Sequence, residues 1–326
     1  MKRKTFLGWL GAGIAAAALP AQAQAPFQFD KTIRYVVPYA PGGPTDAAAR
    51  IVAEELGKRV GQPVVIFNRP GGATLTGANE VKASPADGYT LFMGSSTTFA
   101  LAPLQFKNVT VTLEDFEAIG AIAKVPYVFV VSSKVPATNM KEFVAWVKSR
   151  PDGFNFGTVG QGSSTHLAGL ILSKSLGIKG TPVHYKGAGP AMADLLAGHT
   201  DAQVDPLTTS IQGHRTGKIR IIAGIGAKRA VEFPEIPTLQ EQGVRGLEEI
   251  PAVFGLSVKA GTPGAAVNAL RQHLNAIVSD PAVAARLKTV GLEAAPIIGE
   301  DYNKLLRFHA EWYRKEVTEN KIQFAE

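Results

Sequence analysis

Short apolar runs alternate with segments of helical periodicity along most of the chain. In the first part of the chain, three apolar runs predict strands at 33–39, 63–68 and 89–94. A helix is expected over 45–60, because an apolar residue recurs there every four positions. A second helix is expected to end near residue 82. Strands that alternate with helices in this way are typical of a parallel sheet covered on both faces.

The pattern continues into a second group of elements. A long apolar run at 119–131, interrupted by Lys124 and Pro126, predicts a strand that enters a second lobe, and 253–258 is expected to carry the chain back. The other predicted strands are 154–159, 182–185, 202–204 and 219–225, and the other helices are 139–149, 164–176, 190–196, 263–278, 281–290 and 301–318.

These elements predict an α/β fold of two doubly wound lobes with a ligand cleft between them. The first lobe is expected to combine residues 24–126 with residues 251–326. The second lobe is expected to comprise residues 127–250. Two lobes joined by crossing strands suit the chain because it contains no long linker and no low-complexity segment.

The first residues are typical of a secretory signal peptide. Three cations at 2–4 precede an uncharged run rich in Ala and Leu at 6–19, and a small-residue cleavage pattern follows at 21–23. The apolar run is short for a membrane span, which needs about 18 to 20 apolar residues. We therefore expect cleavage after Ala23, a mature start at Gln24 and a periplasmic protein, with an uncleaved anchor as the alternative.

Charge and cysteine content exclude several classes of function. The chain holds 34 basic and 27 acidic residues, a net charge of +7, and three of the basic residues belong to the signal peptide. The remaining excess of about +4 is spread without a basic block, so it favours attraction of anionic solutes and not nucleic-acid binding. The absence of cysteine excludes disulfides, thiolate metal sites and a cysteine nucleophile. No metal or other cofactor is expected.

One arrangement recurs four times: a predicted strand, a loop of Gly, Ser or Thr, and the start of a helix. It occurs at 39–46, 94–98, 157–165 and 185–190. In a parallel sheet such loops lie at the carboxyl ends of the strands, where open α/β folds bind ligands. Helix N-termini offer free N–H groups and a partial positive charge, which suit a carboxylate or a phosphate. We therefore expect several helix starts to clamp an anion from two lobes.

Each loop taken alone has a simpler explanation. Thr45, Asp46, Ser164 and Thr165 are all suited to capping their helices. Asp46 is expected to be such a cap, because its charge would repel a carboxylate. The glycines at 157–162 lack the G-x-G-x-x-G spacing of a dinucleotide loop, and no P-loop is present.

Catalytic motifs are absent from the sequence. There is no G-x-S-x-G elbow and no H-E-x-x-H pair. Among six separated histidines only His166 is a candidate, as a ligand donor or as a base for Ser163, and a structural hydrogen bond is the alternative. Asp205 follows a strand and either accepts from a ligand or braces its own loop. Lys186 suits a second carboxylate, whereas Arg69 fits a turn better than an anion site.

Seven motifs occur in order through the mature chain. They are Val37-Pro38-Tyr39-Ala40-Pro41-Gly42-Gly43 with Asp46, Asn68-Arg69-Pro70-Gly71, Asp87-Gly88-Tyr89-Thr90-Leu91, the segment 160–169, Tyr185-Lys186-Gly187, Asp194-Leu195-Leu196-Ala197-Gly198 and Gly261-Thr262-Pro263. In these motifs the chain resembles the Bug family, the periplasmic solute receptors of tripartite tricarboxylate transporters. The resemblance implies a type II periplasmic-binding-protein fold that closes on its ligand and delivers it to a membrane permease. It also implies that the loops 41–43, partly through ordered water, and 160–165 hold one ligand carboxylate.

The loops and the resemblance together define the expected binding residues. They are Tyr39, Pro41, Gly42, Gly43, Thr45, Ser95, Thr98, Gly160, Gly162, Ser163, Ser164, Thr165, His166, Lys186, Asp205 and Phe254. The chain has Val253 and Phe254 where many members of the family carry Trp, and Phe99 follows the hydroxyl loop. Apolar surface beside hydroxyls favours an aromatic mono- or dicarboxylate such as terephthalate.

Other functions fit parts of the pattern. A citrate or C4-dicarboxylate receptor is the nearest alternative, although a tricarboxylate would need more fixed cations. A serine hydrolase would use Ser163 or Ser164 with His166, but it lacks a third catalytic member. A ligand-gated protein that signals through a membrane sensor would share the fold. The expected partners are the ligand and the permease subunits, and a monomer is expected.

Overall fold

The structure, a computed structural model, describes residues 27–106, 108–226, 228–230, 233–247, 250, 252–319 and 321–322. The predicted signal peptide and the predicted mature start at Gln24 lie outside these residues. No helix in the described ranges is both long enough and apolar enough to cross a membrane.

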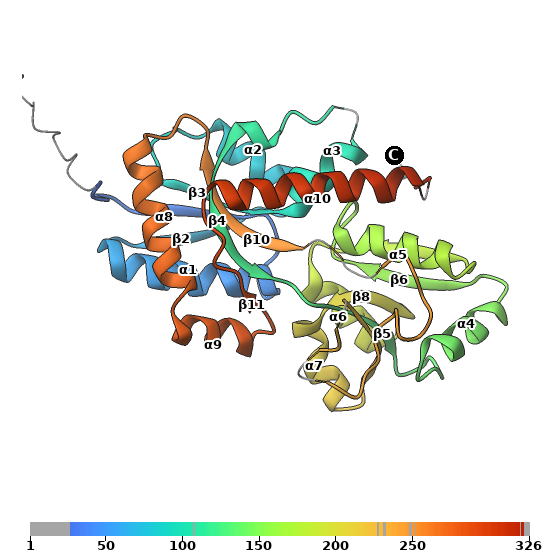
Figure 1. The fold of residues 1–326 in the computed structure, drawn as a ribbon. Helices are drawn as coiled ribbons and strands as arrows, with labels where there is room; N and C mark the ends of the chain where they lie inside the picture. The colour runs from blue at the N-terminus through green and yellow to red at the C-terminus, as the bar shows by residue number, and fades with distance from the viewer. Residues whose placement is uncertain are drawn as a thin grey trace, which may run out of the picture.

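The first lobe is built around a mixed sheet with the strand order β11-β4-β10-β3-β1-β2. Its strands are β1 (Ile33–Val37), β2 (Val64–Asn68), β3 (Thr90–Ser95), β4 (Phe116–Lys124), β10 (Val253–Lys259) and β11 (Glu293–Ala294). β1 pairs in parallel with β2 and β3, whereas β10 runs antiparallel between β3 and β4. The three parallel strands match the predicted strand–helix alternation, and their carboxyl ends point toward the second lobe (Figure 1).

Helices cover both faces of this sheet. One face carries α1 (Pro44–Val60), α8 (Gly264–Val278) and α9 (Pro281–Thr289), and the other carries α2 (Leu75–Ala83) and α10 (Glu300–Glu319). Side chains therefore alternate between two cores: Tyr35 and Leu91 pack in the first, and Val36 and Phe92 pack in the second. Short turns at Gly72–Thr74, Thr97–Leu101, Ala102–Gln105 and Leu113–Asp115 complete the lobe.

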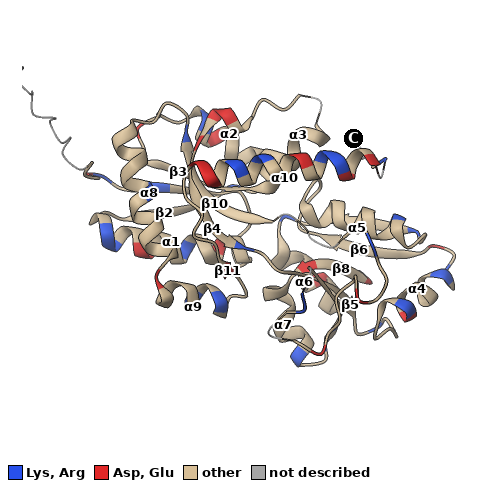
Figure 2. Cartoon of the chain, in the orientation of Figure 1, with Lys and Arg blue, Asp and Glu red and all other residues tan. Residues whose placement is uncertain are grey.

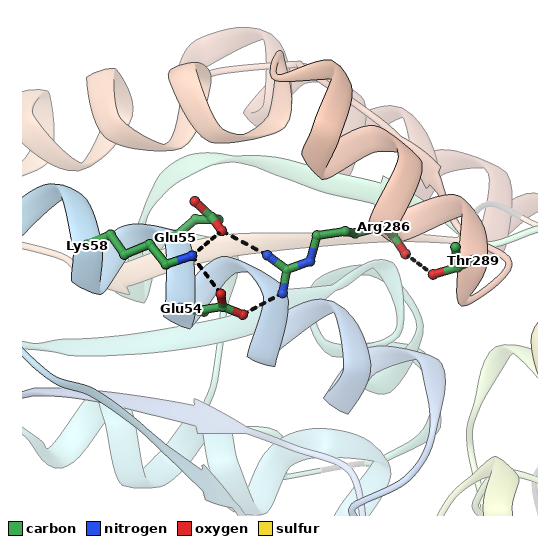
Figure 3. Close-up of polar contacts among 5 residues, drawn as sticks. All are labelled: Glu54, Glu55, Lys58, Arg286 and Thr289. Atoms are coloured by element: carbon green, nitrogen blue, oxygen red, sulfur yellow. Dashed lines mark hydrogen bonds and ion pairs between the residues drawn. The ribbon is translucent and has the colours of Figure 1, made fainter.

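Surface ion pairs join α9 to α1 (Figure 3). The Arg286 guanidinium lies 2.5 Å from Glu54 and 2.8 Å from Glu55, and the Lys58 ammonium lies 2.6 Å and 3.0 Å from the same carboxylates. These side chains are largely solvated, so apolar contacts such as that of Leu287 with the core contribute more to the packing of α9.

The second lobe is built around a five-stranded sheet with the order β7-β6-β8-β5-β9. Its strands are β5 (Tyr127–Ser132), β6 (Phe154–Thr158), β7 (Gly180–His184), β8 (Ala202–Pro206) and β9 (Ile219–Ile225). One face carries α4 (Met140–Lys148) and α5 (Ser164–Ser175), and the other carries α6 (Ala188–Ala197) and α7 (Leu207–Arg215). On the first face, the ring of Phe143 lies 5.0 Å from that of Phe129 and 5.1 Å from that of Phe154.

Three features of the fold differ from the sequence-based expectation. Both sheets are mixed, because β5 and β10 run antiparallel to their neighbours. The apolar run 119–131 is two strands in two different sheets, separated at Val125 and Pro126. The helix α7 was not predicted, since its sequence is rich in residues of modest helix propensity such as Thr and Ser.

The chain passes between the lobes at two adjacent points. One is Val125-Pro126, between β4 and β5, and the other is Ala252, just before β10. The Val125 N–H donates to the Ala252 carbonyl over 3.1 Å, so the two connections are hydrogen-bonded to each other. The carboxyl ends of the parallel strands in both sheets face the space beside these connections (Figure 1). Lys, Arg, Asp and Glu are interspersed over the visible helices of both lobes (Figure 2).

Candidate ligand-binding site

A small cavity lies where the loops of the two lobes meet. Its volume is about 30 Å³. It is lined by Tyr39, Ala40, Gly43, Pro44, Thr45, Ser95, Ser96, Thr97, Tyr127, Val159, Ser164, Gly187, Ala188, Pro206, Ala252, Val253 and Phe254. Since one water needs roughly 10 to 15 Å³ of such space, the lobes must part or side chains must move to admit a solute.

A second cavity of about 180 Å³ adjoins the first. The two cavities share Tyr39, Thr97 and Val159 in their walls. The other lining residues of the second are Pro38, Pro70, Gly71, Gly72, Ala73, Thr74, Phe106, Gly160, Gln161, Ser163, Tyr185 and Lys186. Tyr39 therefore stands between two adjoining spaces, and its movement would join them.

The loop from β1 to α1 is held in place by a buried carboxylate. Asp46 accepts hydrogen bonds from the Gly42 N–H at 3.1 Å, from Asn68 at 3.0 Å and from Arg50 at 2.9 Å. Burial raises the pKa of Asp46, but the bonds from Arg50, Asn68 and Gly42 outweigh it and the pKa lies below its ordinary value. The charge of Asp46 is thus satisfied within the loop, and Gly43 rather than a capping side chain starts α1.

The segment after β3 is helical, not the open loop that its hydroxyl residues suggested. It enters a π-helical turn at Thr97, and all of 95–98 is buried. The Tyr39 hydroxyl hydrogen-bonds to Ser95 and Thr97, and burial raises the pKa of this phenol despite these bonds. Thr98 lines neither cavity, and its hydroxyl lies 2.7 Å from that of Thr74 and 3.2 Å from that of Ser95.

The loop from β6 to α5 presents one serine to the first cavity. Ser163 caps α5 by accepting from the His166 N–H at 3.2 Å, and Thr165 accepts from the Val159 N–H at 3.0 Å. Ser164 instead faces the other lobe, where its Oγ lies 2.9 Å from Thr97 Oγ1. Ser163 is thus used as a cap and Thr165 holds the loop through Val159, whereas Ser164 lines the first cavity.

His166 supports this loop. Its Nδ1 accepts from the Gly162 N–H at 3.1 Å, and its ring packs 4.5 Å from that of His184. Burial, with a smaller contribution from His184, lowers the pKa of His166 to about 4. The imidazole is therefore neutral at pH 7, and the bond to Gly162 matches the structural alternative considered for this residue.

Helix N-termini converge on the cavities from both lobes. The residues that start four helices line one cavity or the other: Gly43 for α1, Ser163 for α5, Gly187 for α6 and Pro206 for α7. Each helix start brings N–H groups that have no partner within the helix and a partial positive charge. No acidic side chain lines either cavity, and Lys186 is the one cation in these walls as the structure describes them. The arrangement can bind an anion largely through backbone groups.

Apolar and aromatic groups complete the first cavity. The rings of Tyr39 and Phe254 lie 6.2 Å apart, and Tyr127 lines the same wall. Phe99 does not reach the cavity, contrary to expectation. It packs 6.1 Å from Phe92 and 5.3 Å from Phe116 in the core of the first lobe, because the helical turn directs its ring inward.

The expected binding residues fall into three groups. The first cavity is lined by Tyr39, Gly43, Thr45, Ser95, Ser164 and Phe254. The second cavity also contains Gly160, Ser163 and Lys186. The walls of neither cavity contain Pro41, Gly42, Thr98, Gly162, Thr165, His166 or Asp205.

Several lining residues were not identified from the sequence. Thr97 was within a predicted loop, but Tyr127, Ala188 and Pro206 were not singled out. Ala188 follows β7 and Pro206 ends β8, so the rule that ligands bind at strand carboxyl ends was sufficient to find them. Tyr127 starts β5 immediately after the crossing at Pro126, and its position depends on how the two lobes are joined.

Asp205 lies behind the cavity wall. It is fully buried, and its Oδ2 accepts hydrogen bonds from Thr209 and, at 2.7 Å, from Ser210 in the first turns of α7. Burial raises the pKa of Asp205 to about 7, although the bonds from Ser210 and Thr209 oppose the shift. Of the two roles considered for this residue, these contacts favour bracing of the loop.

Among the described residues, no group of three or more His, Asp and Glu side chains is placed to hold a metal ion. The polar groups of the site are backbone N–H groups, hydroxyls, the Gln161 amide and one lysine, which suit reversible binding of an anion.

Residues 48–318 match the family model described as the tripartite tricarboxylate transporter family receptor. The chain belongs to this family. BugT of Bordetella pertussis is 31% identical over 304 residues, which cover 91% of each chain. The predicted membership in the Bug family is therefore confirmed.

Solved structures of other receptors share the fold. The periplasmic binding protein BugD is 30% identical with a TM-score of 0.85, and the match covers 90% of this chain and 99% of BugD. MatC of Rhodopseudomonas palustris, solved with malate, is 28% identical with a TM-score of 0.82, covering 88% of this chain and 99% of MatC. An R. palustris relative solved with adipate is 29% identical with a TM-score of 0.86, and the match covers 90% of this chain and 98% of the relative.

These similarities confirm the α/β two-lobed fold of a periplasmic binding protein. This receptor is a solute-binding protein and not an enzyme. The serine hydrolase alternative is thereby excluded.

The buried carboxyl of Asp205 is expected to make stability depend on pH. The folded-state pKa of about 7 lies above the unfolded value of roughly 3.9, so the stabilising contribution is full below pH 3.9 and is lost as the pH rises through 7. Asp205→Asn removes this titration while keeping an acceptor for Ser210. The free energy of unfolding, measured with urea, should change differently in the two proteins between about pH 4 and pH 8. Relative to the variant, the wild type should lose about 2–4 kcal/mol over this range.

Asp152→Asn is a matched control, because Asp152 is exposed on the surface. Its pH profile should run parallel to that of the wild type. Identical profiles for the wild type and Asp205→Asn would show that the carboxyl titrates normally.

Proposed function

We propose that this receptor captures a small carboxylate, with aromatic mono- and dicarboxylates of the terephthalate type first, and delivers it to the membrane permease of a tripartite tricarboxylate transporter. One observation carries the proposal: four helix N-termini from two lobes converge on two adjoining cavities whose walls contain no acidic side chain. Such a site stabilises an anion and offers no partner for an ammonium group.

The proposed carboxylate position lies between Gly43 and Thr45 of the first lobe and Ser164 and Ala188 of the second. Backbone N–H groups at the starts of α1 and α6 and the hydroxyls of Thr45 and Ser164 provide donors there. Closure of the lobes brings these donors together, so binding and closure reinforce each other.

The aromatic preference is supported by the walls of the first cavity. Tyr39, Tyr127 and Phe254 offer ring surface, and burial of a ligand ring contributes roughly 25 cal/mol per Å² of apolar area. Displacement of Tyr39 would join the second cavity to the first. Lys186 lines the second cavity and can bind a second carboxylate there. The relatives solved with malate and adipate also favour small dicarboxylates. Citrate carries three charges, and a single lysine compensates poorly for their lost hydration.

A thermal-shift panel tests the ligand class. We expect terephthalate and benzoate to raise the melting temperature of the mature protein, terephthalate more strongly, with smaller effects of C4-dicarboxylates and citrate. Lys186→Met should reduce the affinity for terephthalate about tenfold and leave benzoate unchanged, because only terephthalate has a second carboxylate. Lys218→Met, at another exposed lysine of the same lobe, is the control. Saturable stabilisation by citrate and none by an aromatic acid would refute the aromatic preference but not the carboxylate receptor.

Gly43→Val tests the proposed carboxylate position. A Cβ at Gly43 would meet no heavy atom within 4 Å, so the variant should fold normally. Its methyl groups should nevertheless hinder the approach of a carboxylate to the start of α1 and weaken binding at least tenfold, corresponding to about 1.4 kcal/mol. Calorimetry with the best ligand of the panel provides the measurement. Gly264→Val, also at an unobstructed helix start but remote from the cavities, should bind normally, and unimpaired binding by both variants would place the carboxylate elsewhere.

We also propose export to the periplasm with removal of residues 1–23, which is supported by the signal pattern and by the periplasmic relatives. Sequencing the N-terminus of the protein from a periplasmic extract should give Gln24 first. An intact Met1 in that fraction would contradict cleavage.

A further inference from the structure

The C-terminal helix α10 extends from the first lobe toward α5 of the second (Figure 1). Its first half packs in the core of the first lobe through Tyr302 and Leu306. One turn farther on, His309 is 6% exposed, and Tyr313 in the following turn is fully buried. The same helix therefore carries polar side chains into the interior beside the cavity.

His309 fixes this part of α10 to the first lobe. Its Nδ1 lies 2.8 Å from the hydroxyl oxygen of Ser96, which also accepts from the Val253 N–H at 3.4 Å. Ser96 and Val253 both line the first cavity. Burial, with a smaller contribution from Lys124, lowers the pKa of His309 to about 4, so the ring is neutral at pH 7.

Tyr313 reaches the second lobe. Its hydroxyl lies 2.8 Å from Ser164 Oγ, and Ser164 Oγ lies 2.9 Å from Thr97 Oγ1. Ser164 and Thr97 are each 5% exposed, so this row of three hydroxyls is shielded from water. The row links Tyr313 of α10, in the first lobe, to Ser164 of the second lobe and then to Thr97 of the first lobe. Burial raises the pKa of Tyr313, so the phenol keeps its proton.

We propose that Tyr313 is a positioning residue, which orients the Ser164 hydroxyl toward the cavity and ties the two lobes in the closed arrangement. The phenolic O–H is the better donor of the pair, so it donates to Ser164 Oγ. Ser164 is then left to donate its own proton to Thr97 or to a ligand oxygen. The orientation of Ser164 toward a ligand rests on the proposed function, whereas the tie between the lobes does not.

The tie can be tested without any ligand. Since the chain has no cysteine, Arg59→Cys in α1 and Ala145→Cys in α4 give two unique exposed sites for spin labels, one in each lobe. Pulsed electron–electron double resonance then measures the distance between the two labels and so the populations of the closed and open states. Tyr313→Phe keeps the ring and removes only the hydroxyl, and it should lower the closed-to-open ratio about fivefold.

Tyr302→Phe is the matched control. It makes the same chemical change in the same helix at a fully buried tyrosine whose hydroxyl has no hydrogen-bond partner among the described residues. The closed-to-open ratio of this variant should equal that of the wild type.

A second comparison shows whether Tyr313 acts through Ser164. In a Ser164→Ala background, Tyr313→Phe should cause no further shift, because the bond is already absent. An unchanged ratio for Tyr313→Phe, an equal shift in both backgrounds, or a ligand-free wild type with only the open distance would each overturn the proposal. If no carboxylate in the thermal-shift panel raised the melting temperature, the proposed function would be refuted. The spin-label distances would still test the tie between the lobes, because they are measured without ligand.

Discussion

The site depends on the two adjacent connections between the lobes. One connection leaves the first sheet after β4, and the other returns to it before β10. The Val125 N–H of the first connection donates a hydrogen bond to the Ala252 carbonyl of the second. Because the connections are close together, the carboxyl ends of both sets of parallel strands face one cleft. Every loop that lines the cavities, and each helix that starts there, is positioned by this constraint.

An anion site built in this way needs few charged side chains. The carboxylate of Asp46 is used inside the first lobe to hold its loop, and it is already paired with Arg50. Backbone N–H groups at helix starts are fixed by the fold and lose no side-chain entropy on binding. Affinity for a carboxylate can therefore be retained in a family whose members differ in the rest of the ligand. In the proposed site, the aromatic groups at Tyr39, Tyr127 and Phe254 line the space for the rest of the solute.

Much of the site could be predicted from the sequence because its signals are local. The Gly43 turn depends on neighbouring residues and lies where the pattern indicated. The cap of α5, in contrast, is Ser163 and not Ser164 or Thr165, which the sequence suggested. Phe99 and Thr98 illustrate the limit. Their sequence suggests a hydroxyl loop beside a ring, but a π-helical turn points both into the interior. A shift of that turn by one residue would change which side chains face the ligand, and nothing in the local sequence determines it.

The sequence by itself determined the succession of strands and helices, the glycine and hydroxyl loops at helix starts, and the family. These follow from periodicity and capping, which operate over a few residues. Only the tertiary structure decided that β5 and β10 run antiparallel, that Asp205 is buried behind the cavity wall, and that Tyr313 meets Ser164. The contact between Tyr313 and Ser164, for example, joins residues 149 positions apart. They depend on the relative placement of two lobes, which no local pattern specifies.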